Sequence, residues 1–219
     1  MTTGARELLE TMRARADIDP LANPFVAAVV EGRAPVASVA AFAAEERHII
    51  PSDRRSFLLL AARAEEPVAV EFFTTLAQGE NLVLPMVSAL AAGAGMAGPA
   101  LAAYEPQAGC QAYPGYVAWL ALNADPAGAA LALVANFAAW GGYCAALAGA
   151  LRERYGFDDT SCAFLDFFAT PAPGLAEQAV RAAQEALDAG RPLTHARRYA
   201  RLLHDVETTF WHTLAAVAH

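Results

Sequence analysis

The sequence consists largely of Ala-rich apolar stretches with a helical period, separated by short breaks that contain Pro or Gly. Alanine is the best helix former, and alternating runs of β-branched residues, which indicate strands, are nearly absent. The pattern predicts helices near residues 3–16, 23–31, 35–49, 52–64, 66–78, 82–93, 113–122, 126–153, 160–169, 173–189 and 192–217. No break is long enough to separate domains, so we expect residues 1–219 to form one all-α domain, a bundle of rather long helices.

The predicted breaks fall where Pro or Gly interrupts the helical pattern. They are Asp19-Pro20, Gly32, Pro51, Gly79, the GAGMAG run from 93, Glu105-Pro106, Asp125-Pro126, Gly156 and the TPAPG run from Thr170. Glu80 follows one of these breaks, so we expect it in the first turn of a helix, where the helix dipole favours a carboxylate.

Charge and composition exclude several classes of function. The net charge is -8 and the 15 Lys and Arg residues are scattered, so no basic patch suits a nucleic acid. The first residues carry charges at helical spacing and lack the apolar core of a secretory signal. The most apolar stretch, 127–151, is rich in Ala and Gly, which favours a buried helix over a membrane span. Three cysteines without CxxC spacing fit reduced thiols, and we expect a cytoplasmic protein without a membrane partner.

A carboxylate interrupts the apolar face of the last predicted helix. On a helical wheel Glu207 lies in a stripe with Leu203, Phe210, Trp211 and Leu214. An ionised carboxylate in apolar surroundings is costly unless it is paired, hydrogen-bonded or neutralised. Glu207 is therefore a candidate functional residue.

A second carboxylate has a similar setting. Glu46 shares its helix face with Val39, Phe42, Ala43 and Ile50. It could also lie at the edge of that face and pair with an Arg, and both interpretations stay open at this stage. If Glu46 and Glu207 face one cavity, small-molecule binding or catalysis is favoured, whereas a buried Arg beside each would indicate a structural role.

Aromatic and amide side chains accompany these acids on other predicted helices. On the long helix from residue 126, Tyr143 lies over Asn136, Ala139 and Trp140, and Tyr113 opens a further helix before a proline. An aromatic cavity with a few convergent polar groups is the usual form of a small-molecule site in a helix bundle. We therefore expect a small planar heterocycle to bind between Tyr113, Tyr143, Trp211 and Phe42.

Several segments, in the same order, resemble one known family. They are NPFVAAVVEG from residue 23, the carboxylate pair Glu45-Glu46, CQAYPGYVAWLA from 110, NFAAWGGYCAALAGAL from 136 and VETTFW from 206. Together they resemble the TenA proteins, thiaminase II and its relatives, which have the haem-oxygenase-like all-α fold. The most specific piece is ETTFW, which is similar to the family's Glu-x-x-Phe-Trp.

The resemblance implies roles for individual residues. In that family an acid on the first core helix holds an aminopyrimidine, and its position matches Glu46 here, where the family more often has Asp. The pocket tyrosines match Tyr113 and Tyr143, and the proton-handling Glu matches Glu207. A carboxylate with a raised pKa acts as general acid and base near neutral pH. No cofactor is implied.

The sequence also departs from the family pattern. The position of the nucleophilic Cys, four residues before Tyr143, is Ala139, and aromatic positions that are usually Tyr are Phe168 and Ile49. Cys144 lies well around the helix from that face and is expected to be a small buried hydrophobe. The resemblance therefore implies hydrolysis of a C–N bond in aminopyrimidine salvage through carboxylates, in a drier pocket than that of a thiaminase.

Other functions known in this fold remain alternatives. A PqqC-like or iron-dependent oxidase needs Arg and His residues in the pocket or several converging metal ligands, whereas His204 and His212 are expected on the solvent side of the last helix. A non-catalytic ligand-binding protein that kept the pocket is the other alternative. Because the apolar composition leaves surface patches, we expect a homo-oligomer, a dimer or a tetramer.

Overall fold

The computed structural model describes residues 4–14 and 19–217, and these residues form helices with no β-strand among them. This confirms the expected all-α, single-domain fold. The helices are α1 (Ala5–Arg13), the 3₁₀ turn η1 (Pro20–Ala22), α2 (Pro24–Val30), α3 (Val36–Arg63), α4 (Pro67–Gly93), α5 (Gly98–Ala102), α6 (Ala108–Asn123), α7 (Pro126–Tyr155), α8 (Asp159–Ala169), α9 (Pro173–Asp188) and α10 (Ala196–Val217).

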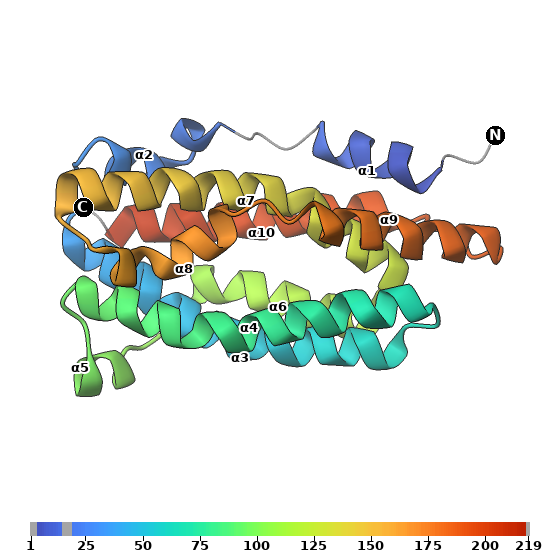
Figure 1. Cartoon of the computed structure of the whole chain (residues 1–219), viewed down its shortest axis with the longest axis horizontal. Coiled ribbons are helices and arrows are strands. Elements are labelled where there is room, and N and C mark those ends of the chain that lie inside the picture. The colour runs from blue at the N-terminus through green and yellow to red at the C-terminus, as the bar shows by residue number, and fades with distance from the viewer. Residues whose placement is uncertain (1–3, 15–18, 218–219) are drawn as a thin grey trace.

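The long helices run roughly along the long axis of the molecule (Figure 1). Helices α3 and α4 form one packed pair, and α6 joins α3 to α10. Helix α7 packs beside α10 on the other side of the bundle, with α1 and α2 along its outer surface. Helix α8 packs against both α4 and α7, so it bridges the two halves.

Two predicted breaks are wrong, because the helices continue through them. The two breaks are Pro51, which lies inside α3, and Gly79, which lies inside α4. Helix α4 also contains Pro85, and α6, which starts at Ala108, contains Pro114. A proline inside a helix removes one hydrogen bond and costs about 3 kcal/mol. The bundle buries residues of α3 on both sides of its proline, and this tertiary burial outweighs the local preference.

The other predicted boundaries differ by a few residues. The first helix is Ala5–Arg13 rather than 3–16, and residues 3, 15 and 16 of that prediction lie outside the described residues. The last helix starts at Ala196. The expectation for Glu80 is also wrong, because α4 is continuous and Glu80 lies in its middle rather than in a first turn.

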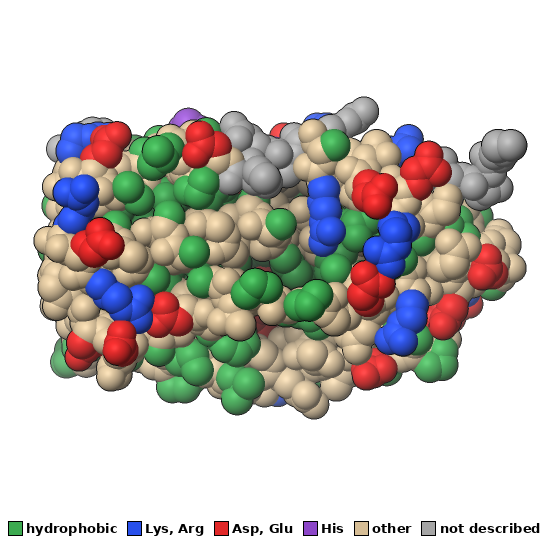
Figure 2. Space-filling view, turned by 45° about the horizontal axis from the view of Figure 1, so that its top comes forward, with side chains coloured by type: hydrophobic (Ala, Val, Ile, Leu, Met, Phe, Trp, Pro, Cys, Tyr) green, Lys and Arg blue, Asp and Glu red, His purple; other side chains and the backbone are tan. Residues whose placement is uncertain are grey.

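Helix α7 passes through the whole core. It is long and apolar enough to cross a membrane, with a mean hydropathy of 1.5, yet 61% of that apolar window is buried inside the bundle. The core helix of a soluble protein has the same properties. On the face shown in Figure 2, charged side chains gather mainly towards the two ends, and acidic and basic groups alternate there.

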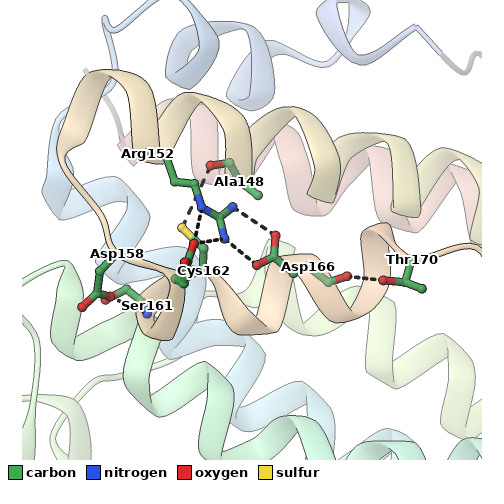
Figure 3. A network of polar contacts seen from close by, with 8 residues as sticks. Ala148, Arg152, Asp158, Ser161, Cys162, Asp166 and Thr170 are labelled. Atoms are coloured by element: carbon green, nitrogen blue, oxygen red, sulfur yellow. Dashed lines mark hydrogen bonds and ion pairs between the residues drawn. The ribbon is translucent and has the colours of Figure 1, made fainter.

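Polar contacts fasten α8 to α7 (Figure 3). The Arg152 guanidinium donates to both carboxylate oxygens of Asp166, at 3.0 and 2.6 Å, and to Asp159 at 2.9 Å. Asp158 caps α8 by accepting a hydrogen bond from the Ser161 amide at 2.8 Å. Bidentate Arg–carboxylate pairs fix geometry as well as adding energy. The contacts hold α8 in register, and this helix carries aromatic residues of the core.

Gly141 allows the close approach of α8. A Cβ atom at Gly141 would lie 3.0 Å from the backbone carbonyl oxygen of Phe168, whereas a Cβ at Gly149, on the same helix, would meet nothing within 4 Å. Inside an exposed part of a helix, Gly→Ala stabilises by up to about 1 kcal/mol. An added methyl group therefore meets a close backbone contact at Gly141 and open space at Gly149.

We predict that Gly149→Ala raises the free energy of unfolding by about 1 kcal/mol. The free energy of unfolding of Gly141→Ala should be about 1–2 kcal/mol lower than that of Gly149→Ala, because the new methyl group pushes the Phe168 backbone away. Urea unfolding of both variants measures the difference. Equal stabilisation by the two substitutions would show that α8 yields freely at this contact.

Candidate functional site

Polar side chains from five helices lie between two apolar clusters of the core. On α10, Leu203 belongs to one cluster, Phe210 belongs to the other, and Glu207 lies between them. Tyr113 packs against both clusters. We call these polar residues the polar layer: Asp53 on α3, Glu80 on α4, Tyr113 on α6, Asn136 on α7 and Glu207 on α10.

Glu207 is almost completely buried, with 3% of its surface exposed. The Trp211 indole Nε1 donates a hydrogen bond to Glu207 Oε1 at 3.2 Å, and the Asn136 side chain also bonds this carboxyl group. Burial raises the pKa of Glu207 to about 7, and the two hydrogen bonds limit the rise. Near neutral pH this group therefore can both give and take a proton.

Glu46 and Asp53 are buried carboxyl groups two turns apart on α3. Burial raises both pKa values well above the usual range, and the nearby Glu80 raises both further. Glu207 adds to the effect on Glu46. The Asp53 Oδ1 atom is buried without a hydrogen-bond partner.

None of the ion pairs among the described residues involves these acids or Glu207. A buried Arg beside each acid, the structural explanation, is therefore not what holds them. Uncompensated carboxyl groups in a low dielectric remain protonated until a positive or amino-bearing group approaches. The polar layer is thus suited to a ligand that carries such a group.

Glu45, the neighbour of Glu46, has a different environment. It accepts hydrogen bonds from the Tyr104 hydroxyl at 2.8 Å, the Gln107 amide at 2.7 Å and the Gln111 side chain at 2.8 Å. All three donors lie in or before α6, so Glu45 fastens α3 to that part of the chain. Of the adjacent pair, Glu46 is the acid that takes no part in these three hydrogen bonds.

The aromatic residues named from the sequence pack tightly on one another. Phe42 and Trp211 stack with ring centroids 5.9 Å apart, and Tyr143 meets Trp211 edge-on at 5.5 Å. Phe168 contacts Trp140 at 5.9 Å. Such contacts stabilise a dense core. Phe42 and Phe168 therefore act as packing residues in this structure.

Two hollows approach Glu207 from the surface. The larger, of about 190 Å³, is lined by Ala22, Asn23, Pro24, Tyr143, His204, Thr208, Trp211 and His212. The smaller, of about 70 Å³, is lined by Thr11, Met12, Ala132, Ala135, Asn136, Arg197, Ala200, Arg201 and His204. Trp211 lines one hollow and Asn136 the other, and both are hydrogen-bonded to Glu207. One layer of side chains thus separates this carboxyl group from each hollow.

Three residues near the site were not selected in the sequence analysis: His204, His212 and Asp53. His204 is only half-buried on the solvent side as expected, but it lines both hollows, and the exposed His212 lines the larger one. His204 lies one turn before Glu207, and that spacing was the available signal. Asp53 was also missed, although it follows Glu46 by seven residues, which places both on one helix face.

The prediction that Cys144 is a small buried hydrophobe is confirmed. Ala139 is buried with 1% exposure, and Cys144 is fully buried. Burial raises the pKa of the Cys144 thiol, and the nearby Glu46 and Glu207 raise it further. A neutral, enclosed thiol is a poor nucleophile. Among the described residues, no group of three or more His, Cys, Asp or Glu side chains could hold a metal ion.

Comparisons with known proteins agree with the fold. The model of the TENA/THI-4/PQQC family matches residues 17–216. No curated protein matches the sequence. A domain of unknown function with a heme oxygenase-like fold from Shewanella denitrificans OS217 has a TM-score of 0.72 at 14% identity, covering 96% of this chain and 88% of its own.

Two further solved structures are similar. A TenA family transcription regulator from Silicibacter sp. TM1040 has a TM-score of 0.70 at 17% identity and covers 97% of both chains. The TenA homologue from P. horikoshii OT3 has a TM-score of 0.70 at 15% identity, with 97% of this chain and 96% of its own covered. These likenesses confirm the expected haem-oxygenase-like fold.

We predict that Glu207 makes the stability of the protein fall as pH rises from about 4 to 7. Its pKa is about 7 when folded, against about 4.3 in an unfolded chain. Between these values the unfolded chain loses its proton and the folded one keeps it, so raising the pH favours unfolding. Glu207→Gln should remove up to about 3 kcal/mol of this dependence, measured by urea unfolding at each pH.

The comparison with wild type isolates the contribution of Glu207. The other carboxyl groups with raised pKa values lower the stability at high pH in both proteins, so their effect cancels in the difference. Curves of unfolding free energy against pH that run parallel for wild type and Glu207→Gln would contradict the assignment.

Proposed function

The chain belongs to the TENA/THI-4/PQQC family, and on that premise we propose that it hydrolyses a C–N bond of an aminopyrimidine, using carboxyl groups in place of a cysteine nucleophile. The observation that carries the proposal is the state of Glu207. It is buried, its pKa is about 7, and its hydrogen-bond partners line two hollows. A group with this pKa is suited to proton transfer in both directions near neutral pH.

The reaction needs one water molecule and one group that exchanges a proton. As carboxylate, Glu207 removes a proton from water while the water oxygen forms a bond to the ring-bound carbon. As carboxylic acid, it then returns that proton to the nitrogen as the C–N bond breaks. The products are an alcohol, with its hydroxyl on the exocyclic carbon, and an amine, and Glu207 ends in its initial state.

The other acids support binding of an amino-bearing ring. Glu46 is buried, and the polar layer beside it holds no paired Arg or Lys among the described residues. An amino group, or a protonated ring nitrogen, would lower the pKa of Glu46 and form a charge-assisted hydrogen bond with it. Tyr113, within the electrostatic range of Glu46 and Glu207, has a hydroxyl that can orient the same ring.

Ala139 limits the reaction to a direct attack by water. A methyl side chain cannot form the covalent intermediate that a thiolate forms, so no two-step route through this position is available. The proposal is therefore a hydrolase whose turnover depends on the carboxyl group of Glu207 alone for proton transfer.

We predict that Glu207→Gln lowers kcat for an aminopyrimidine substrate by about 10²–10⁴-fold, because the amide cannot exchange a proton. The control is Glu153→Gln, the same chemical change at an exposed position near the end of α7. Product release is followed by chromatography, and a thermal shift with each aminopyrimidine reports binding separately.

Each outcome has a definite meaning. Turnover that persists in Glu207→Gln would contradict the role of this residue. Ligand binding by the wild-type protein without product would contradict hydrolysis and would identify a ligand-binding protein that kept the pocket.

A further inference from the structure

Three basic side chains of α10 line the smaller hollow. Arg197, Arg201 and His204 are spaced by four and three residues, so they lie on one face of the helix. The chain as a whole carries a net charge of -8. A hollow lined by two arginines and a histidine is therefore unlike the average surface of this protein.

The positive charge in this hollow is only partly compensated. Arg201 donates to Asp205 on the same helix at 2.8 Å, in an exposed pair that contributes little. Arg197 takes part in none of the ion pairs among the described residues. Arg13, at the end of α1, donates to the Val134 carbonyl at 3.4 Å. Among the described residues, the ion pairs therefore leave the Arg197 guanidinium without a carboxylate partner.

The opposite wall is suited to exclude water from such an anion. It consists of the apolar Met12, Ala132 and Ala135 together with Thr11, whose hydroxyl bonds the Glu7 carbonyl at 2.8 Å, and the amide of Asn136. Charge interactions next to an apolar wall are stronger than in bulk water. A volume of about 70 Å³ suits one small anionic group rather than a whole ring.

The hollow adjoins the proposed catalytic group. Asn136 lines it and is hydrogen-bonded to Glu207, and His204 is shared with the larger hollow. An anion in the hollow would therefore lie across the Asn136 side chain from the Glu207 carboxyl group.

We propose that the smaller hollow binds a phosphate or carboxylate group carried by the substrate, so that the substrate class is an anionic aminopyrimidine such as a phosphate ester. The proposal rests on the proposed function for the ring and adds the second point of recognition. The Arg197 guanidinium presents its planar set of donors to the anion, which matches the geometry of phosphate and carboxylate oxygens. Arg201 and His204, which line the same hollow, supply further hydrogen-bond donors.

The first experiment compares three ligands by isothermal titration: a hydroxymethyl aminopyrimidine, its phosphate ester and its carboxymethyl analogue. Wild type should bind at least one of the two anionic ligands about tenfold or more tightly than the alcohol, because one or two charge-assisted hydrogen bonds are gained. The preferred anion identifies the group. Arg197→Gln should reduce the difference to about twofold or less.

The matched control is Arg198→Gln. Arg198 is the next residue on α10, and its guanidinium lies over the Tyr199 ring at 5.9 Å rather than in the hollow. The substitution removes the same charge from the same turn of the helix, so it should leave the preference for the anionic ligand intact. An equal loss in both variants would show a general effect of charge and would overturn the site.

A second measurement separates this proposal from the proposed function. Inorganic phosphate and acetate are titrated into the isotopically labelled protein, and the side-chain resonances of Arg197 and His204 are followed. Shifts that saturate in wild type and vanish in Arg197→Gln support the anion site even if no pyrimidine binds. Absence of saturable shifts, together with equal affinity for alcohol and anionic ligands, would overturn the site while leaving the role of Glu207 open to its own test.

Discussion

The structure depends on one constraint: several carboxyl groups are buried, and none of the ion pairs within residues 4–14 and 19–217 involves them. Asp53 and Glu207 lie where two apolar clusters meet, and Glu46 lies two turns before Asp53 on α3. Burial raises the pKa values of all three acids. Filling such positions with apolar residues would be the simpler way to stabilise a bundle. Acids at these positions reduce the stability of the folded protein at high pH, where they tend to ionise. The amino group of a ligand would compensate their negative charge. The acids of the polar layer are therefore the feature on which the proposed binding of an amino-bearing ring rests.

The rest of the bundle holds this layer in place. Helices α3 and α4 continue through Pro51 and Pro85, so each long helix carries residues of both clusters and one acid between them. Glu45 fastens α3 to the segment before α6 through three hydrogen bonds. The Arg152 contacts and the close approach at Gly141 fix α8 against α7. Rigid elements that position a few polar groups are what a small-molecule site in a bundle requires.

The departures from the family pattern change the character of the site. Ala139 in place of a nucleophilic Cys removes covalent catalysis, and Phe168 in place of a Tyr removes a hydroxyl. The aromatic rings pack on one another, with Trp211 between the buried carboxyl group and the larger hollow. Under the proposed function, proton transfer depends on Glu207 and recognition depends on the groups that line the two hollows. The basic face of α10 brings positive charge to a region that otherwise holds acids.

The sequence by itself determined the all-α fold, the family and the inward position of Glu46 and Glu207, because helical periodicity and the ETTFW motif are local patterns. It could not show that α3 passes through Pro51 and α4 through Gly79, since the compensating burial comes from helices distant in sequence. Tertiary packing likewise decided the hydrogen bond of Asn136 to Glu207, the lack of a hydrogen-bond partner for Asp53 Oδ1, and the place of His204 in both hollows. The helical wheel gives the face on which a side chain lies, whereas its neighbours depend on which helices pack against that face.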